Sequence, residues 1–179
     1  MLLIKTNRDT LLKPLQTVTG IVERRQTLPI LSNVLIQQDQ EKTSFLTTDL
    51  EIQIKTVSIK NSSTQQNFSL TVSAKKLQDI LRSLATDAEV TLTRQDDHLQ
   101  VKSGKSAFNL QILPAEDFPE IIEELKSDIF VTLKQSELKK LLHHVQFSVA
   151  QQDIRYYLNG LLLLIENNKL IGVGTDGHR

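Results

Sequence analysis

The stretch LLIKTNRDTLLKPLQTV, residues 2–18, combines the two patterns that decide the fold. It opens with a short run typical of a β-strand and reaches Asn7, a residue type that caps helix N-termini well. Beyond Asn7 the apolar positions recur at helical spacing, and they are Leu11, Pro14, Leu15 and Val18. This stripe predicts an amphipathic helix over residues 7–18 that packs one face on a sheet.

The same strand-then-helix pattern occurs twice more along the chain. Residues 68–73 precede a stripe made of Leu77, Ile80, Leu81 and Leu84, and residues 130–133 precede one made of Leu138, Leu141, Leu142 and Val145. These stripes predict helices over residues 73–84 and 134–145. Ser73 occupies the capping point of the second helix, whereas Lys134 marks the start of the third less clearly.

After each predicted helix, two apolar runs flank a polar turn, which is the pattern of a β-hairpin. The turns fall at 39–42, 95–97 and 167–168. The first and third copies also share a Thr-Asp pair at the same distance from their first helical leucine. The repeating unit is therefore βαβββ, present three times, with the first and third copies most alike.

These repeats predict an α+β fold in which βαβββ units place their helices along one side of antiparallel sheets. Because alternate copies resemble each other, we expect a two-unit domain over residues 1–122, a linker over 123–128 and the first half of a second domain over 129–179. An acidic stretch with Pro114 and Pro119 supports the linker, and a surface loop within one domain is the alternative. On this pattern the chain is expected to be a truncated N-terminal portion.

Composition excludes several classes of protein. The chain has no Cys, so it forms neither disulfides nor thiolate metal sites. Early charges rule out a signal peptide and no apolar run is long enough to span a membrane, so we expect a cytoplasmic protein. No glycine loop for phosphate and no nucleophile elbow is present. Asp176 and His178 are too few ligands for a metal, and the adjacent His143 and His144 diverge on a helix. We expect no catalytic residue, metal or cofactor.

Charge is distributed unevenly although the chain is formally neutral, with 21 basic and 21 acidic residues. The predicted helices contain three acidic and eight basic residues, and the basic ones are Arg8, Lys13, Lys75, Lys76, Arg82, Lys134, Lys139 and Lys140. If the helices share one side of the sheet, they form a positive surface that attracts phosphate backbone without reading bases. The alternative is that these side chains only solvate the helices.

Two loops at equivalent positions of the first and third copies carry a second signal. Arg24 and Arg25 follow the first helix, and Gln152 occupies the position that corresponds to Arg25. Close to Gln152 lie Tyr156 and Tyr157, the only tyrosines of the chain. Basic and aromatic side chains on such loops can grip backbone or stack on bases. The alternative for the tyrosines is partial burial in a core.

Six motifs, in order along the whole chain, resemble the bacterial DNA polymerase III beta sliding clamp family. They are LLKPL (11–15), TLPIL (27–31), TDLE (48–51), LPAEDFP (113–119), RYYLNG (155–160) and TDGHR (175–179). The resemblance implies a ring of two head-to-tail chains, each with three similar domains, whose helices surround duplex DNA. It implies a non-catalytic accessory subunit that keeps a DNA-directed DNA polymerase on its template.

The resemblance also implies roles for individual residues. DNA-binding positions are Arg24, Arg25, Lys75, Gln152, Tyr156 and Tyr157. A second set of positions forms one wall of a pocket for short peptides: Arg155, Leu158, Thr175, Gly177, His178 and Arg179. The peptides belong to the polymerase catalytic subunit, the clamp loader, other polymerases and repair proteins. The ring interface is formed by Lys76, Lys105, Phe108 and Leu110, while a further interface position, usually basic, is Ala107 here. The full-length protein is expected to be a homodimer that binds duplex DNA of any sequence and no membrane.

Two other functions remain open from sequence. A protein-interaction module with the clamp fold would bind peptides without being retained on DNA, and an enzyme would show metal-dependent turnover. A separate hypothesis concerns the third unit, which by itself leaves an open sheet edge and an uncovered apolar face. Because the units are similar, two chains could pair their third units.

Overall fold

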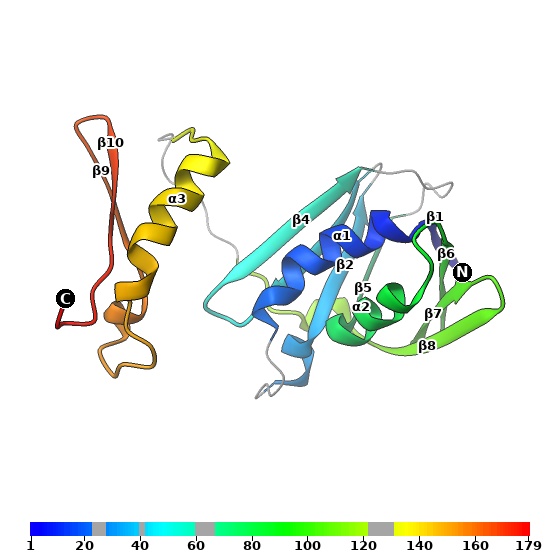
Figure 1. Ribbon diagram of the computed structural model, residues 1–179. Helices are drawn as coiled ribbons and strands as arrows, with labels where there is room; N and C mark the ends of the chain where they lie inside the picture. Colours follow the sequence, from blue (N-terminus) through cyan, green and yellow to red (C-terminus); the bar gives the residue numbers. More distant parts are fainter. Residues whose placement is uncertain (23–27, 40–41, 60–66, 122–130) are drawn as a thin grey trace. The chain divides into compact units, whose positions relative to one another are not determined.

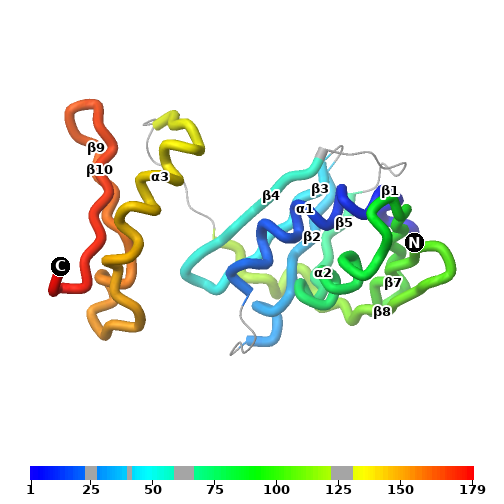
Figure 2. The backbone as a smooth tube through the Cα atoms, viewed as in Figure 1, coloured from blue at the N-terminus to red at the C-terminus, as the bar shows by residue number. Residues whose placement is uncertain are grey.

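The computed structural model describes residues 1–22, 28–39, 42–59, 67–121 and 131–179, which are coloured in Figure 2. The chain divides into two compact parts, Met1–Glu123 and Glu124–Arg179, each of which is described by itself. Arg24, Arg25, Phe130 and the predicted linker 123–128 lie outside the described residues. Among the described helices, none is long and apolar enough to cross a membrane.

The N-terminal part contains two βαβββ units, as the sequence repeats predict. The first unit consists of β1 (Leu2–Asn7), α1 (Arg8–Val18), β2 (Asn33–Asp39), β3 (Lys42–Thr48) and β4 (Gln53–Ile59). The second consists of β5 (Phe68–Ser73), α2 (Ala74–Ser83), β6 (Glu89–Gln95), β7 (His98–Ser103) and β8 (Ser106–Leu113). Short 3₁₀ turns lie at Thr19–Ile21, Pro29–Ser32 and Ala115–Asp117.

The two units exchange their first strands within one antiparallel sheet of order β1-β6-β7-β8-β5-β2-β3-β4. Strand β1 pairs with β6 of the second unit, and β5 pairs with β2 of the first. The register is equivalent in both places, because Asn7 lies opposite Glu89 and Ser73 lies opposite Asn33. The residue that directly precedes each helix thus lies opposite the first residue of a strand in the other unit.

Helices α1 and α2 lie side by side on one face of this sheet (Figure 1). Their stripes, Leu11, Leu15 and Val18 with Leu77 and Leu81, are buried in a core with strand residues such as Val34, Ile36, Val90 and Leu92. A smaller cluster of Leu35, Leu46 and Phe118 forms without the helices. Because the apolar stripes face the sheet, the opposite faces of both helices are left to solvent.

The two helix starts differ in their capping. The Asn7 side chain accepts a hydrogen bond from the backbone N–H of Asp9 at 3.0 Å, so the predicted cap is confirmed. Ser73 occupies the equivalent position but its side chain makes no capping hydrogen bond. The position of a capping residue type therefore marks both helix starts, while only Asn7 satisfies a helix N–H.

The C-terminal part contains α3 (Gln135–Val145) and a hairpin of β9 (Leu162–Glu166) and β10 (Lys169–Val173), with 3₁₀ turns at Gln146–Ser148 and Tyr156–Asn159. The predicted helix and hairpin are confirmed. The strand predicted at 130–133 is wrong for residues 131–133, which form no strand. A strand needs a partner, and β1 and β5 find theirs in another unit. No such unit exists among the described residues of this part.

Candidate functional site

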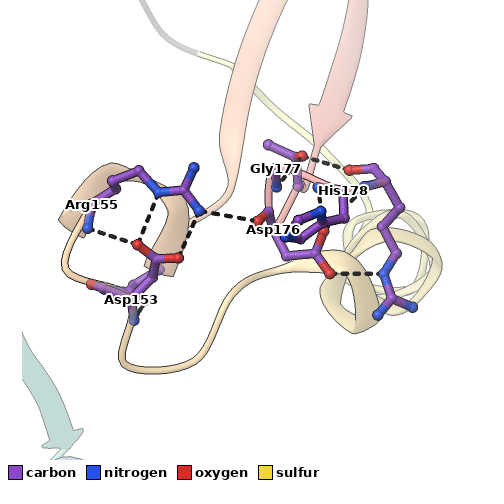
Figure 3. Close-up of polar contacts among 8 residues, drawn as sticks. Asp153, Arg155, Asp176, Gly177 and His178 are labelled. Carbon is purple, nitrogen blue, oxygen red and sulfur yellow. Dashed lines mark hydrogen bonds and ion pairs between the residues drawn. The ribbon is translucent and has the colours of Figure 1, made fainter.

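The loop before Tyr156–Asn159 is organised around an ion pair between Asp153 and Arg155. The guanidinium donates from Nε to Oδ1 at 3.0 Å and from Nη2 to Oδ2 at 2.8 Å, a bidentate arrangement (Figure 3). The backbone N–H of Arg155 donates to Oδ1 as well, at 2.8 Å. A two-pronged contact fixes the plane of the guanidinium as well as its position.

Asn159 and Leu158 close this loop from the other end. The Asn159 amide accepts from the backbone N–H of Asp153 and donates to its carbonyl, each at 2.9 Å. Leu158 is buried, and its carbonyl accepts a hydrogen bond from the N–H of Ala150. The loop is therefore held by a buried leucine beneath and by polar contacts at the surface.

The second segment of the site is the tight turn at 175–179. Asp176 accepts from the backbone N–H groups of His178 and Arg179 and from Nε of Arg179 at 2.8 Å. Thr175 accepts from the N–H of Gly177 and donates to the carbonyl of Arg179. The side chains of Thr175 and Asp176 thus satisfy the hydrogen-bonding groups of the backbone in this turn.

Arg155 joins the two segments. Its Nη2 lies 3.5 Å from the carbonyl oxygen of Asp176 (Figure 3), and a Cβ added at Gly177 would lie 3.1 Å from its Nη1. Gly177 has φ of 86°, in the left-handed region that favours glycine. The structure thus brings Arg155 together with the 175–179 turn, while Leu158 is buried in the same loop as Arg155.

Hydrogen bonds lower the pKa values of both carboxyl groups. The hydrogen bonds from the Arg155 side chain, and then from its backbone, lower the pKa of Asp153 to about 2. The backbone hydrogen bond from His178, followed by the side chain of Arg179, lowers the pKa of Asp176 to about 2. Both groups stay anionic near neutral pH, so neither suits general acid–base chemistry there. No group of three or more potential metal ligands occurs among the described residues.

The tyrosines lie at the surface, so burial in a core is excluded. Tyr156 is 83% exposed and Tyr157 is 67% exposed, and their rings meet edge to face at 6.0 Å. Gln152, in the same loop, is exposed and has φ of 58°. These side chains are free to contact a ligand by stacking or hydrogen bonding.

The basic residues of α1 and α2 differ in whether they already have a partner within the chain. Arg8 is tied to Asp9 at 2.9 Å and to the carbonyl of Leu84 at 2.8 Å. Lys76 and Arg82 are exposed on α2, and Lys75 is half-buried there. Among the described carboxylates, none lies within ion-pair distance of these three α2 residues. Fewer basic side chains on α1 and α2 are therefore available to a ligand than the number of basic residues predicts.

The residues assigned to a ring interface lie on β8, on the turn before it and on α2. Phe108 is 36% exposed, whereas Leu110 is only 6% exposed and belongs to the core. Leu110 can therefore support such an interface from beneath but presents little surface. Strand β8 pairs with β7 from Ser106 to Gln111, whereas β5 pairs only with Ile112 and Leu113. The remaining edge of β8 has no strand partner among the described residues.

Sequence reasoning missed Asp153 and Asn159, and it gave Asp176 no role beyond that of a turn residue. The spacing Asp-x-Arg is a weak signal by itself, and Asn159 acts through a bond that only the folded loop forms. These three side chains hold the shape of the site.

Comparison with known proteins identifies relatives over the whole chain. The model of the DNA polymerase III beta subunit N-terminal domain matches residues 2–122, and that of its central domain matches residues 132–179. The chain is 46% identical over 172 residues to the beta sliding clamp of Pseudomonas putida, covering 96% of this chain and 46% of that protein. It is 42% identical over 172 residues to the beta sliding clamp of Escherichia coli, with the same coverage.

Solved structures of bacterial beta subunits have the same fold as this chain. The DNA polymerase III beta subunit of Pseudomonas aeruginosa superimposes with a TM-score of 0.91 at 42% identity, covering 98% of this chain and 47% of that one. The pol III beta of Caulobacter crescentus gives 0.89 at 36% identity, covering 98% of this chain and 48% of the other. The chain spans about half the length of these relatives, and over that span it belongs to the DNA polymerase III beta subunit family.

Proposed function

We propose that this chain is the N-terminal portion of a DNA sliding clamp, a non-catalytic processivity factor that encircles duplex DNA and tethers the replicative polymerase. The observation that carries the proposal is family membership over 96% of the chain together with the clamp fold. Residues 1–122 would form the first clamp domain, 123–128 a linker and 129–179 the first half of the second. The compartment would be the cytoplasm.

The DNA-facing surface would be the solvent side of α1 and α2. Lys75 and Arg82 are seven residues apart on α2 and therefore lie on one stripe of that helix. Because neither is neutralised by a described carboxylate, both are available to phosphate oxygens. Arg24, Arg25, Gln152, Tyr156 and Tyr157 would add contacts from loops. Such a surface holds DNA without reading its sequence.

The partner-peptide site would be built on the junction of Arg155 and the 175–179 turn. Arg155 and Arg179 form ion pairs with Asp153 and Asp176. The exposed side chains of Phe147, Tyr156 and Tyr157 supply apolar surface in the same compact part. An extended peptide with an apolar anchor and polar ends suits such a surface. Peptides of the polymerase catalytic subunit, the clamp loader and other polymerases are the proposed occupants.

Closure of the ring would use the edge of β8. The unpaired stretch of this strand can add a strand from another chain, with Phe108 packed across the junction and Lys76 and Lys105 forming ion pairs. Ala107 carries no charge, which leaves one fewer ion pair at this edge. The full-length protein would then be a head-to-tail homodimer.

A chimera tests the topological mechanism directly. Residues 1–179 replace the aligned segment of the Escherichia coli beta sliding clamp, which serves as the unmodified control. The chimera is loaded on nicked circular DNA by the clamp loader, and the circle is then cut. Retention on the circle and loss after cutting are expected. Equal binding to circular and linear DNA would overturn the proposal, and peptide binding without retention on the circle would favour a protein-interaction module.

A further inference from the structure

The sequence contains a single asparagine that is directly followed by glycine, and this pair, Asn159–Gly160, ends the loop that carries Arg155. Asparagine before glycine is the pair most prone to lose its side-chain amide spontaneously, because glycine has no side chain to hinder attack by its backbone nitrogen. Both residues of the pair are exposed. The folded loop determines whether this reaction proceeds and what its product disturbs.

The backbone nitrogen of Gly160 is free to act as the nucleophile. Among the described residues, no backbone carbonyl accepts a hydrogen bond from its N–H. The backbone of Gly160 is extended, and a Cβ placed on it would have no atom within 4 Å. Water can therefore reach both the Asn159 amide and the N–H that has to lose its proton.

Asp176–Gly177 is the matching acidic pair of the same site, and its surroundings oppose the equivalent reaction. The N–H of Gly177 donates to the hydroxyl of Thr175 at 3.0 Å, and the Arg155 guanidinium fills the space where a Cβ of residue 177 would lie. Hydrogen bonds also lower the pKa of Asp176 to about 2, and an ionised carboxylate resists a nucleophile. The site thus contains one glycine pair that is open to attack and one that is protected.

We propose that Asn159 is a site of spontaneous deamidation, with water as the only co-reactant. The nitrogen of Gly160 attacks Cγ of Asn159, and the bond between Cγ and Nδ2 breaks. The amide leaves as ammonia, which takes the proton from Gly160, and a cyclic imide remains. Water then opens the imide at either of its carbonyl groups, which leaves an aspartate or an isoaspartate at position 159. No group is oxidised or reduced.

The product cannot hold the loop as Asn159 does. The Asn159 amide accepts from the backbone N–H of Asp153 and donates to its carbonyl oxygen, each at 2.9 Å. A carboxylate has no hydrogen to donate, so one of its oxygens would face that carbonyl oxygen. It also adds a negative charge beside Asp153, whose own carboxylate pairs with Arg155. Deamidation therefore releases this end of the loop and loosens the position of Arg155.

The same two hydrogen bonds slow the reaction, because they hold the amide that has to react. A hydrogen bond of this kind shifts an equilibrium by only about fivefold, so the contacts with Asp153 delay deamidation without preventing it. The change is consequently slow and cumulative. The fraction of molecules with a released loop rises with the age of the protein.

Mass spectrometry of the 179-residue chain during incubation at neutral pH measures the reaction. Trypsin cleaves after Arg155 and Lys169, which gives one peptide that contains Asn159, Asn167 and Asn168. The last two are exposed and are not followed by glycine, so they serve as internal standards. Deamidation of Asn159 is expected to be faster by roughly tenfold or more, because glycine removes the hindrance. Equal rates at the three positions would overturn the proposal.

Gly160→Ala is the matched control. The extended backbone suits alanine and the added Cβ meets open space, so the variant should fold as the unmodified chain does. Its methyl group hinders the attack, so deamidation of Asn159 should fall to the rate of Asn167. An unchanged rate would show that the Gly160 nitrogen is not the nucleophile.

Asn159→Asp reproduces the charge of the product and tests the released loop. The NMR signal of Arg155 Nε should move in this variant and in incubated unmodified protein, whereas Gly160→Ala should leave it in place. An unmoved signal in Asn159→Asp would overturn the loss of the loop contacts. Neither this measurement nor the rate requires a partner.

The effect on partner binding rests on the proposed function, and the chimera with the Escherichia coli clamp keeps the two questions apart. The probe is a synthetic peptide of the polymerase catalytic subunit that the unmodified Escherichia coli clamp binds. Asn159→Asp in the chimera should weaken its binding at least tenfold, while Gly160→Ala should not. Equal binding by all three chimeras would overturn the consequence for the site. No binding by the unmodified chimera would count against the proposed function, whereas the deamidation rate would still decide the modification.

Discussion

The Arg155 guanidinium fills the space where a side chain at residue 177 would begin, because a Cβ atom placed on Gly177 would lie 3.1 Å from Nη1 of Arg155 and 3.3 Å from Nη2. Glycine meets two requirements here, since its φ of 86° is strained for other residues and its missing side chain leaves room for the guanidinium. This neighbourhood joins two segments of the candidate peptide site. A side chain added at Gly177 should therefore displace the Arg155 guanidinium and disturb its ion pair with Asp153.

Gly177→Ala is therefore expected to move the Arg155 guanidinium and to weaken peptide binding. Gly104→Ala is the matched control, because Gly104 has φ of 54° but no atom within 4 Å of an added Cβ. Both changes strain the backbone by about 1 kcal/mol, but only Gly177→Ala should shift the NMR signals of Arg155 Nε and of the Asp153 carboxyl. Identical spectra of the two Arg155 side chains would contradict the role assigned to the contact.

The pH dependence of the Asp153–Arg155 pair follows from its lowered pKa. The folded-state pKa of Asp153 is about 2, below its ordinary value of 3.8, so the pair stabilises the loop above about pH 4 and loses this effect as the pH falls toward 2. Carboxyl NMR shifts measured against pH should show this low titration. Arg155→Gln should raise the pKa of Asp153 toward its ordinary value.

Asp97 provides the internal control for that titration. Its pKa is lowered mainly by the side chain of Gln111 and then by His98, in the N-terminal part. Arg155→Gln should leave Asp97 unchanged. A parallel shift of both carboxyls would indicate general unfolding rather than loss of one ion pair.

The two helix starts allow a matched test of capping. Asn7→Ala removes the acceptor for the Asp9 N–H and is expected to lower the free energy of unfolding by about 1 kcal/mol. Ser73→Ala removes no capping bond and should change it by only a few tenths. Urea unfolding followed by circular dichroism measures both. A larger loss for Ser73→Ala would show that its hydroxyl stabilises the fold in another way.

The basic surface of α2 can be tested by the salt dependence of duplex binding. Lys75→Gln is expected to weaken binding equally for all sequences and to reduce the slope of log K against log salt by about one. Lys55→Gln is the control, because Lys55 alternates with Ile54, which packs against the helix-side core, and so lies on the opposite face of β4. Fluorescence anisotropy at several salt concentrations gives both slopes. The same slope change for the two variants would argue against a DNA-facing helix surface.

Much of the fold was predictable because its helices and hairpins are encoded locally. The leucine stripes place α1, α2 and α3 within a residue or two of their observed bounds, since helical periodicity is a property of one segment. The strand expected at 131–133 failed for the opposite reason. Its sequence suits a strand, but strand formation depends on a partner that lies elsewhere.

The candidate site was predictable only in outline. Arg155, Gly177 and the exposed tyrosines stand in recognisable motifs, and the structure brings Arg155 to the 175–179 turn. The contribution of Asp153 depends on loop geometry that no periodicity encodes. The burial of Leu110 was missed because alternation along β8 fixes which residues share a face but not which face is covered.

The exchange of first strands between units has a consequence for synthesis on the ribosome. Strand β1 begins at Leu2, yet its partner β6 extends to Thr93, and the terminal amine itself bonds to the carbonyl of Arg94. Strand β1 must therefore remain without its partner until β6 (Glu89–Gln95) has been translated. The β-rich N-terminal part can close only late, and its earliest strand is the one exposed longest to chaperones and to other nascent chains.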